Sequence, residues 1–255
     1  MLQFLFMRER ETGRFSEALY ILPQITVIVR ARNEAKNILT TLESLFSQTF
    51  KNFEVIVVDN GSCDGTGDLA KQFFDNHPEI HGRLVFEPEI GRGKALHTGV
   101  EQVNNEWIAC LDGDSTASPT WLAHISSFIV KHPDYVAGSG SIIFRDGLPH
   151  HKFLYQAGRG AVYSFSSVTN RGWISLANSW FRKSIFLEIG GTKDLPSNVI
   201  VDDRILALRL RPHGKIAYLN GSAVRTSNWL TEKKKWVSGL LEELEQVKVL
   251  ANIPQ

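Results

Sequence analysis

Strands and helices are predicted to alternate four times in the first half of this chain, and this alternation constrains its fold more than any other feature. Apolar and β-branched runs predict strands at residues 25–29, 53–58, 84–87 and 107–111. A helix with Asn33 as its N-cap is expected after the first strand, with its inward face formed by Ile38, Leu42, Leu45 and Phe46. Such βαβ units build a mainly parallel sheet, so we expect one α/β domain with a Rossmann-like mixed sheet flanked by helices.

The second half of the chain has a less regular pattern. Strands are predicted at residues 136–144 and 215–219, and short helices at residues 183–189 and 202–210. The segment 150–178 is rich in aromatic residues, Gly and Ser without a clear period, which favours loops and short helices around a pocket. We therefore expect the second half to supply irregular structure around a more regular first half.

We expect three parts in the chain: an N-terminal appendage at residues 1–22, one domain at residues 23–228 and a C-terminal amphipathic helix at residues 229–255. The appendage starts with a short apolar run that charged residues follow directly, which is unlike a secretory signal. We expect it to pack on the domain or on a partner chain, so a homodimer remains open. No run of eighteen apolar residues occurs, so no transmembrane helix is expected.

Composition excludes several classes of partner and site. The 28 Lys and Arg residues nearly balance the 27 Asp and Glu residues, so no net field draws the chain to nucleic acid. The two cysteines, Cys63 and Cys110, have neither the spacing of a zinc site nor that of a disulfide framework. They are compatible with a reducing compartment, and we expect the cytoplasm.

Three acidic turns follow separate predicted strands: Asp59, Asp112 with Asp114, and Asp202 with Asp203. Ligands of open α/β sheets bind beyond the carboxyl ends of the strands, where these turns are expected to lie. A single Asp-Gly-Asp is often an ordinary turn, in which Gly113 lets the chain change direction. Several carboxylates at one edge repel one another unless a cation compensates, and oxygen ligands of this kind suit Mg²⁺ or Mn²⁺.

The chain resembles the inverting, family-two glycosyltransferases with the GT-A fold over roughly residues 24–240. The resemblance rests on an ordered set of motifs, none of which is specific alone. They are Val29-Arg30-Ala31-Arg32-Asn33-Glu34, Val58-Asp59-Asn60-Gly61-Ser62 with Asp64-Gly65-Thr66, Gly91-Arg92-Gly93-Lys94-Ala95-Leu96, Asp112-Gly113-Asp114, Phe181-Arg182-Lys183 with Gly190-Gly191, and Asp202-Asp203.

The resemblance implies a nucleotide-sugar site in residues 23–115 and an acceptor site in residues 116–228. Residues Ala31, Arg32, Asn33 and Glu34 would lie against the base and ribose of the donor. Asp59 would accept a hydrogen bond from uracil N3–H, or else it only caps the following turn. Family members often carry a second acid where this chain has Asn60, and an amide both donates and accepts.

The remaining donor contacts implied by the resemblance involve charged residues. Arg92 and Lys94 would contact the base or the diphosphate, or else they form a solvated basic turn. Asp112 would contact the ribose or the metal, Gly113 would lie between the two acids, and Asp114 would be the metal ligand. The expected cofactor is Mn²⁺ or Mg²⁺, which offsets charge on the departing diphosphate.

Asp203 is the predicted general base, because the second acid of the pair faces the acceptor hydroxyl in the family. A base within hydrogen-bond reach of that hydroxyl is what single displacement with inversion requires. The alternative is that both acids only favour a helix N-terminus. The expected sugar or acceptor contacts are Trp180, Asp202, Lys235 and Trp236. Trp180 would otherwise belong to the core.

Residues 232–236 are similar to the Gln-x-x-Arg-Trp signature of processive polysaccharide synthases but depart from it at two of its three specified positions. This departure favours a single transfer over polymerisation. The basic, partly apolar helix could also touch an anionic membrane, which suits a lipid-linked acceptor and a peripheral location.

The predicted function is metal-dependent transfer of a sugar, with inversion, from a UDP-sugar to a hydroxyl of a glycan, lipid-linked or small-molecule acceptor. Two alternatives remain open at this point. One is a non-catalytic relative that binds a sugar nucleotide or a protein. The other is a nucleotidyltransferase, although residues 31–34 lack the glycine-rich phosphate loop expected after its first strand.

Overall fold

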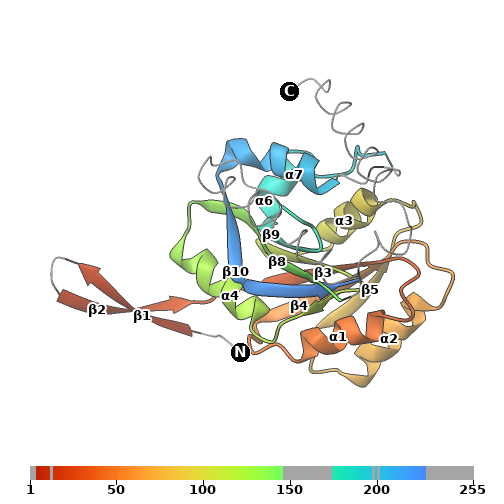
Figure 1. The fold of residues 1–255 in the computed structure, drawn as a ribbon, viewed down its shortest axis with the longest axis horizontal. Coiled ribbons are helices and arrows are strands. Elements are labelled where there is room, and N and C mark those ends of the chain that lie inside the picture. Colours follow the sequence, from red (N-terminus) through yellow and green to blue (C-terminus); the bar gives the residue numbers. More distant parts are fainter. Residues whose placement is uncertain (1–3, 12–13, 146–173, 197–198, 200–201, 228–255) are drawn as a thin grey trace.

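The computed structural model describes residues 4–11, 14–145, 174–196, 199 and 202–227. These residues form an eight-stranded mixed sheet in the order β5-β4-β3-β6-β9-β8-β10-β7, with helices on both faces (Figure 1). The expected α/β architecture with a mainly parallel sheet is confirmed. Among the described residues, none of the helices has both the length and the apolar character needed to cross a bilayer.

The first half of the sheet is the regular βαβ array that the sequence predicts. Its strands β3 (Ile25–Ala31), β4 (Phe53–Asp59), β5 (Gly82–Phe86) and β6 (Trp107–Asp112) run parallel. The helices between them are α1 (Ile38–Phe46), α2 (Thr66–Asn76) and α3 (Arg92–Glu101). Because these strands are parallel and in register, their carboxyl ends meet at one edge.

The second half adds strands of both directions to the same sheet. Its elements are β7 (Thr116–Ala117), α4 (Trp121–Lys131), β8 (Tyr135–Phe144), β9 (Asn178–Arg182), α6 (Lys183–Glu188), α7 (Asp202–Leu210), a 3-10 turn at Arg211–His213 and β10 (Lys215–Thr226). Strand β9 is antiparallel to both β6 and β8, whereas β10 is parallel to β8. Strand β10 extends well beyond the predicted end at residue 219, after a break in its register with β8.

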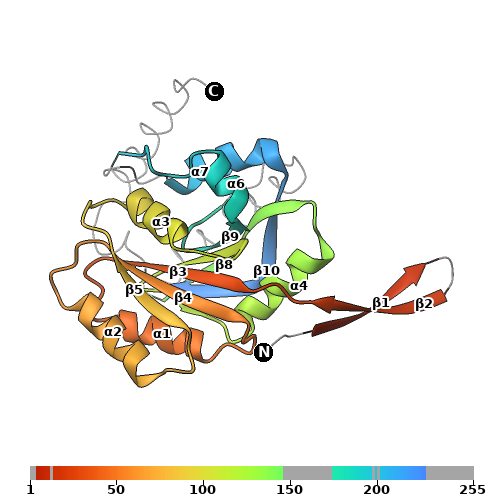
Figure 2. The same cartoon turned by 180° about the vertical axis from the view of Figure 1, so that it is seen from behind.

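Two hydrophobic clusters cover the two faces of the sheet. Val27 and Val29 face a cluster that includes α1, α2 and α4, whereas Ile28 faces a cluster that includes α3, α6 and α7. Alternate residues of β3 therefore point to opposite faces, as the pleat of a strand requires. Figure 2 shows the same two helical layers from behind.

The start of the first helix and the N-terminal appendage differ from expectation. Helix α1 has Asn37 as its N-cap, whereas Asn33 lies earlier in a left-handed conformation (φ 55°), and Phe46 is 38% exposed. Residues 1–22 include an antiparallel hairpin of β1 (Phe4–Glu11) and β2 (Arg14–Ile21). The hairpin extends away from the body in both views, so it does not pack on the domain as one expectation held. The predicted C-terminal helix at 229–255 and most of segment 150–178 lie outside the described residues.

Candidate functional site

The in-register ends of three parallel strands bring the acidic turns of the first half together. Asp59 on β4 pairs with Ala31 on β3, and Asp112 on β6 pairs with Arg30 on β3. Ala31 is buried, and Arg32 beyond it is exposed. The sequence therefore predicted correctly that these carboxylates lie at one edge of the sheet.

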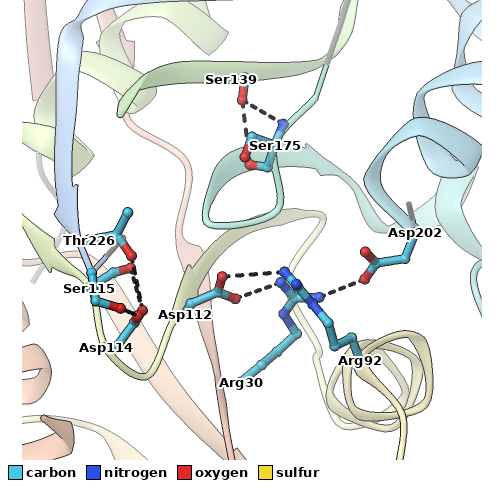
Figure 3. A network of polar contacts seen from close by, with 10 residues as sticks. Arg30, Arg92, Asp112, Asp114, Ser115, Ser139, Ser175, Asp202 and Thr226 are labelled. Atoms are coloured by element: carbon cyan, nitrogen blue, oxygen red, sulfur yellow. Dashed lines mark hydrogen bonds and ion pairs between the residues drawn. The ribbon is translucent and has the colours of Figure 1, made fainter. Parts of the chain in front are cut away.

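Arg30 joins the two halves of the site through a buried pair of ionic contacts (Figure 3). Its Nη2 lies 2.6 Å from Asp112 Oδ1, and its Nη1 lies 3.0 Å from Asp202 Oδ2 at the start of α7. Burial opposes the charge of Arg30, but the two carboxylates raise its pKa. Sequence reasoning assigned Arg30 no separate role, although a charged residue within a buried, β-branched strand was a usable signal.

Asp112 has a second cationic neighbour. Arg92 Nη2 lies 3.5 Å from Asp112 Oδ2, and the Arg92 side chain is half exposed. Burial would raise the pKa of Asp112, but Arg30 and Arg92 outweigh this effect and hold that pKa below its usual range. Asp112 is therefore an ionised carboxylate whose two oxygens already face guanidinium groups.

Asp114 has a different environment from Asp112. Its carboxylate accepts hydrogen bonds from the hydroxyls of Thr226 (3.0 Å), Ser115 (3.1 Å) and Ser227. Its backbone carbonyl accepts a hydrogen bond from Arg145 Nη2 at 2.7 Å. Hydroxyl groups orient a carboxylate without neutralising its charge, so Asp114 is better suited than Asp112 to hold a cation.

Gly113 is required for close packing rather than for an unusual backbone angle. It is absent from the residues with positive φ, which corrects the expectation that its freedom makes the turn. A Cβ at this position would lie 2.9 Å from the Ala31 Cβ. Its N–H donates to the Arg30 carbonyl, and its own carbonyl accepts from the Thr41 hydroxyl at 2.8 Å each. The Asp112–Asp114 turn is thus held tightly against β3 and α1.

Glu34 places a further carboxylate near the two aspartates. It accepts a hydrogen bond from Asn37 Nδ2 at 2.8 Å, and its backbone N–H donates to Thr66 Oγ1 at 2.8 Å. Burial raises the pKa of Glu34 to about 7, repulsion from Asp114 and Asp112 adds to this rise, and the Asn37 hydrogen bond opposes it. The repulsion shows a local excess of negative charge, which fits the binding of a cation.

Turns at the ends of β3 and β4 hold each other in place. Asn33 Oδ1 accepts from the Cys63 N–H at 2.9 Å, and the Asn33 N–H donates to Ser62 Oγ at 3.0 Å. Asp59 is 7% exposed, and its Oδ1 accepts from the Ser62 N–H at 3.0 Å. Asp59 therefore caps its turn, as one of the two sequence interpretations held.

Asn60 fixes the loop that leads to α3. Its Nδ2 donates to the carbonyls of Glu87 and Glu89 at 3.1 and 2.8 Å, and its Oδ1 accepts from the Gly91 N–H at 2.8 Å. An aspartate could not make the two donations. Lys94 on α3 lies 3.1 Å from Glu89 in the same loop, so this predicted donor contact already has an acidic partner.

Asp203 is partly buried and has a like charge beside it. Burial and repulsion from Asp202 raise the pKa of Asp203 to about 7, while the cationic Arg92 and Arg204 oppose the rise. Its Oδ1 accepts a hydrogen bond from the Arg204 N–H at 2.8 Å. A carboxyl group with such a pKa is suited to accept a proton near neutral pH.

Two of the predicted sugar or acceptor contacts are buried in the structure, and the other two lie outside the described residues. Trp180 is 1% exposed and packs against Trp107 and Phe128, so it belongs to the core. Asp202 is also 1% exposed and faces Arg30, so it offers no surface to an acceptor. Lys235 and Trp236 lie outside the described residues.

No metal site made of protein groups alone is present in the described part of the chain. Within those ranges, three or more His, Cys, Asp or Glu residues do not gather closely enough to hold an ion. The donor set instead fits an ion that takes one or two carboxylates and completes its shell with water and phosphate oxygens, as Mg²⁺ usually does.

Comparison with known proteins identifies the family. The sequence model of glycosyl transferase family 2 matches residues 26–190. Glycosyltransferase AglE of Haloferax volcanii is 34% identical over 152 residues, which cover 58% of this chain and 46% of that protein. Probable glycosyltransferase YdaM of Bacillus subtilis is 31% identical over 240 residues, which cover 89% of this chain and 55% of that protein. The chain thus spans about half the length of these relatives.

Solved structures share the fold. Mannosyltransferase PcManGT of Pyrobaculum calidifontis, in complex with GDP-Man and Mn²⁺, has a TM-score of 0.65 at 23% identity, covering 81% of this chain and 57% of that one. TarS of S. aureus, in complex with UDP-GlcNAc, has a TM-score of 0.63 at 19% identity, covering 80% of this chain and 58% of that one. At these identities the likeness establishes the fold alone, and it confirms the expected GT-A architecture.

Proposed function

The chain belongs to glycosyl transferase family 2, and from this premise we propose that it transfers a sugar from a UDP-sugar to an acceptor hydroxyl, with inversion and with help from a divalent metal. One observation carries the proposal. The Asp112–Asp114 turn and the Asp202–Asp203 pair, far apart in sequence, meet through Arg30 at the carboxyl edge of the sheet. This edge is where open α/β sheets bind their ligands.

The donor side of the proposed site comprises the ends of β3, β4 and β6. Asp59 Oδ1 accepts the turn-capping bond, and we assign the second carboxylate oxygen, which lies beside Gly67 of α2, to uracil N3–H. Residues 31–34 lie next to it and would face the base and ribose, with Arg92 near the diphosphate. The related folds bind a uridine nucleotide in TarS and a guanosine nucleotide in PcManGT, so the choice of uridine rests on Asp59 alone.

The proposed metal is held by Asp114, with Asp112 close by. Either Mn²⁺ or Mg²⁺ suits the hard oxygen atoms of this turn, and the solved complex of PcManGT contains Mn²⁺. When bound, the ion would stabilise negative charge on the departing diphosphate. The hydroxyls of Ser115, Thr226 and Ser227 would orient the Asp114 carboxylate for this task.

Asp203 is the proposed general base. The acceptor oxygen attacks the anomeric carbon of the donor sugar while the Asp203 carboxylate takes the hydroxyl proton. The bond from that carbon to the diphosphate oxygen breaks, and its electron pair leaves with UDP. One displacement on the face opposite the leaving group inverts the anomeric centre.

Nucleotide binding and transfer test different parts of this proposal. Calorimetry with UDP, GDP, CDP and dTDP, each with and without Mn²⁺, should show metal-dependent binding that favours UDP. Asp114→Ala should weaken the metal-dependent part, whereas Asp134→Asn is a control because this exposed acid pairs with Lys215 away from the site. A panel of UDP-sugars and hydroxyl acceptors should then show transfer that Asp203→Asn abolishes while UDP binding persists. Binding of no nucleotide would overturn the proposal.

A further inference from the structure

Arg30 is a buried guanidinium that holds two carboxylates from distant parts of the chain. It is 6% exposed, and the carboxylates follow it by 82 and 172 positions. Each of its two terminal nitrogens binds a different carboxylate, since Nη2 donates to Asp112 and Nη1 donates to Asp202. A planar guanidinium can hold two partners in fixed directions, which a single ammonium group does less well.

The two partners belong to the two functional halves of the proposed site. Asp112 begins the acidic turn on the donor side, and Asp202 is bonded in sequence to Asp203 on the acceptor side. We infer that Arg30 is a positioning residue that sets the Asp203 carboxylate relative to the donor by holding Asp202 and Asp112 on one rigid guanidinium. This inference rests on the proposed function, which it deepens.

The surroundings of Asp202 indicate how strongly its position depends on Arg30. Asp202 is 1% exposed, and its Oδ1 has no hydrogen-bond partner among the described residues. The Arg30 contact through Oδ2 is therefore the polar anchor that the structure gives this side chain at the first turn of α7. A change at Arg30 should move or loosen that turn, and Asp203 with it.

A purely structural ion pair would give a different result from a positioning residue. Loss of a structural pair lowers the free energy of unfolding but leaves the turnover of the folded fraction unchanged. Loss of a positioning residue lowers kcat in folded protein, because misplacement by about 1 Å can reduce a rate by about 100-fold. The two readings are separated by measuring both quantities on the same variants.

The variants that test the inference are Arg30→Met, Arg30→Lys, Asp202→Ala and the double variant Arg30→Met with Asp202→Ala. Arg83→Met is a matched control, since Arg83 pairs with Glu54 at the opposite end of the parallel strands. All are assayed as the full chain for thermal unfolding, UDP binding with Mn²⁺, and transfer kinetics at a pH above the acid limb of the wild-type profile.

Asp202→Ala is expected to lower kcat by about 100-fold while UDP affinity stays within about 2-fold, because the Arg30–Asp112 contact remains. Arg30→Met should lower kcat similarly and also weaken UDP binding. The double variant should be no slower than Arg30→Met, since both changes cut the same link. Arg30→Lys keeps the positive charge, so its kcat should lie between those of Arg30→Met and the wild type. This variant also keeps the test valid if Arg30→Met folds poorly.

Wild-type kcat in folded Arg30→Lys and Asp202→Ala protein would overturn the inference and leave the proposed function intact. Equal losses in Arg83→Met would also overturn it, because they would mark a general effect of weakened stability. Absence of transfer by the wild-type chain with every donor would overturn the proposed function, and the inference with it.

Discussion

Asn60 Oδ1 accepts a hydrogen bond from the Gly91 N–H at 2.8 Å, and this contact ties the end of β4 to the start of α3. The same side chain donates to the carbonyls of Glu87 and Glu89. All polar atoms of the Asn60 amide are therefore used inside the protein. The amide that stands where family members often carry an acid therefore holds the loop between β5 and α3, and we expect this to be its role.

Asn60→Asp should weaken UDP binding by about 10-fold, because a carboxylate cannot donate to the two carbonyls and would repel them. The loop that leads to Arg92 at the start of α3 would then lose its anchor. Isothermal calorimetry with UDP and Mn²⁺ measures the effect. Asn52→Asp is the control, since Asn52 donates to the Leu22 carbonyl at the far end of β4. Equal affinity of Asn60→Asp and the wild type would contradict this role.

The pH dependence of transfer should follow the Asp203 carboxyl. Its pKa is raised to about 7, so the base is protonated and inactive at lower pH, and kcat/KM should fall as the pH drops below about 7. Asp202→Asn removes a negative charge beside Asp203 and should lower its pKa. The acid limb should therefore move to lower pH, while Arg92 and Arg204 keep their opposing effect. An acid limb at the same pH in Asp202→Asn as in the wild type would exclude Asp203 as the titrating group.

The hydroxyls around Asp114 should determine how well the metal supports UDP binding. Thr226→Val removes a 3.0 Å hydrogen bond to the carboxylate, and hydrogen bonds to charged groups contribute about 1.5–3 kcal/mol. Metal-dependent UDP affinity should fall by about 10-fold, whereas affinity without metal should stay the same. Thr49→Val is a suitable control, because the exposed Thr49 hydroxyl donates to the Pro119 carbonyl. A loss that is equal with and without Mn²⁺ would indicate a general structural effect.

The sequence predicted the first half of the fold closely because periodicity and strand endings are local signals. The runs at 25–29, 53–58 and 107–111 all became parallel strands, and their order brought Asp59 and Asp112 to one edge. The link between Asp112 and Asp202 was not predictable in this way, because it depends on which helix packs beside Arg30. The spacing of residues along the sequence does not predict the contact of Asp202 with Arg30.

The same limit explains why the sequence left two interpretations of Trp180, a sugar contact and a core residue. The identity of a tryptophan in the sequence does not show whether its side chain faces solvent or the core. The residues on the neighbouring strands determine which way it faces. On β9 the ring lies over Gly138 of β8, where an added Cβ would come within 2.4 Å of it. The glycine on the neighbouring strand was a usable signal that a large side chain is packed there.

Trp180→Phe should therefore lower stability without changing donor recognition. The smaller ring leaves a cavity beside Trp107 and Phe128, and core truncations of this kind cost about 1–3 kcal/mol in the free energy of unfolding. Urea unfolding monitored by circular dichroism measures that loss. The KM for the donor sugar should stay within about 2-fold of the wild-type value, because the ring is 1% exposed and cannot stack on a ligand. A large rise in KM with unchanged stability would instead return Trp180 to the sugar site.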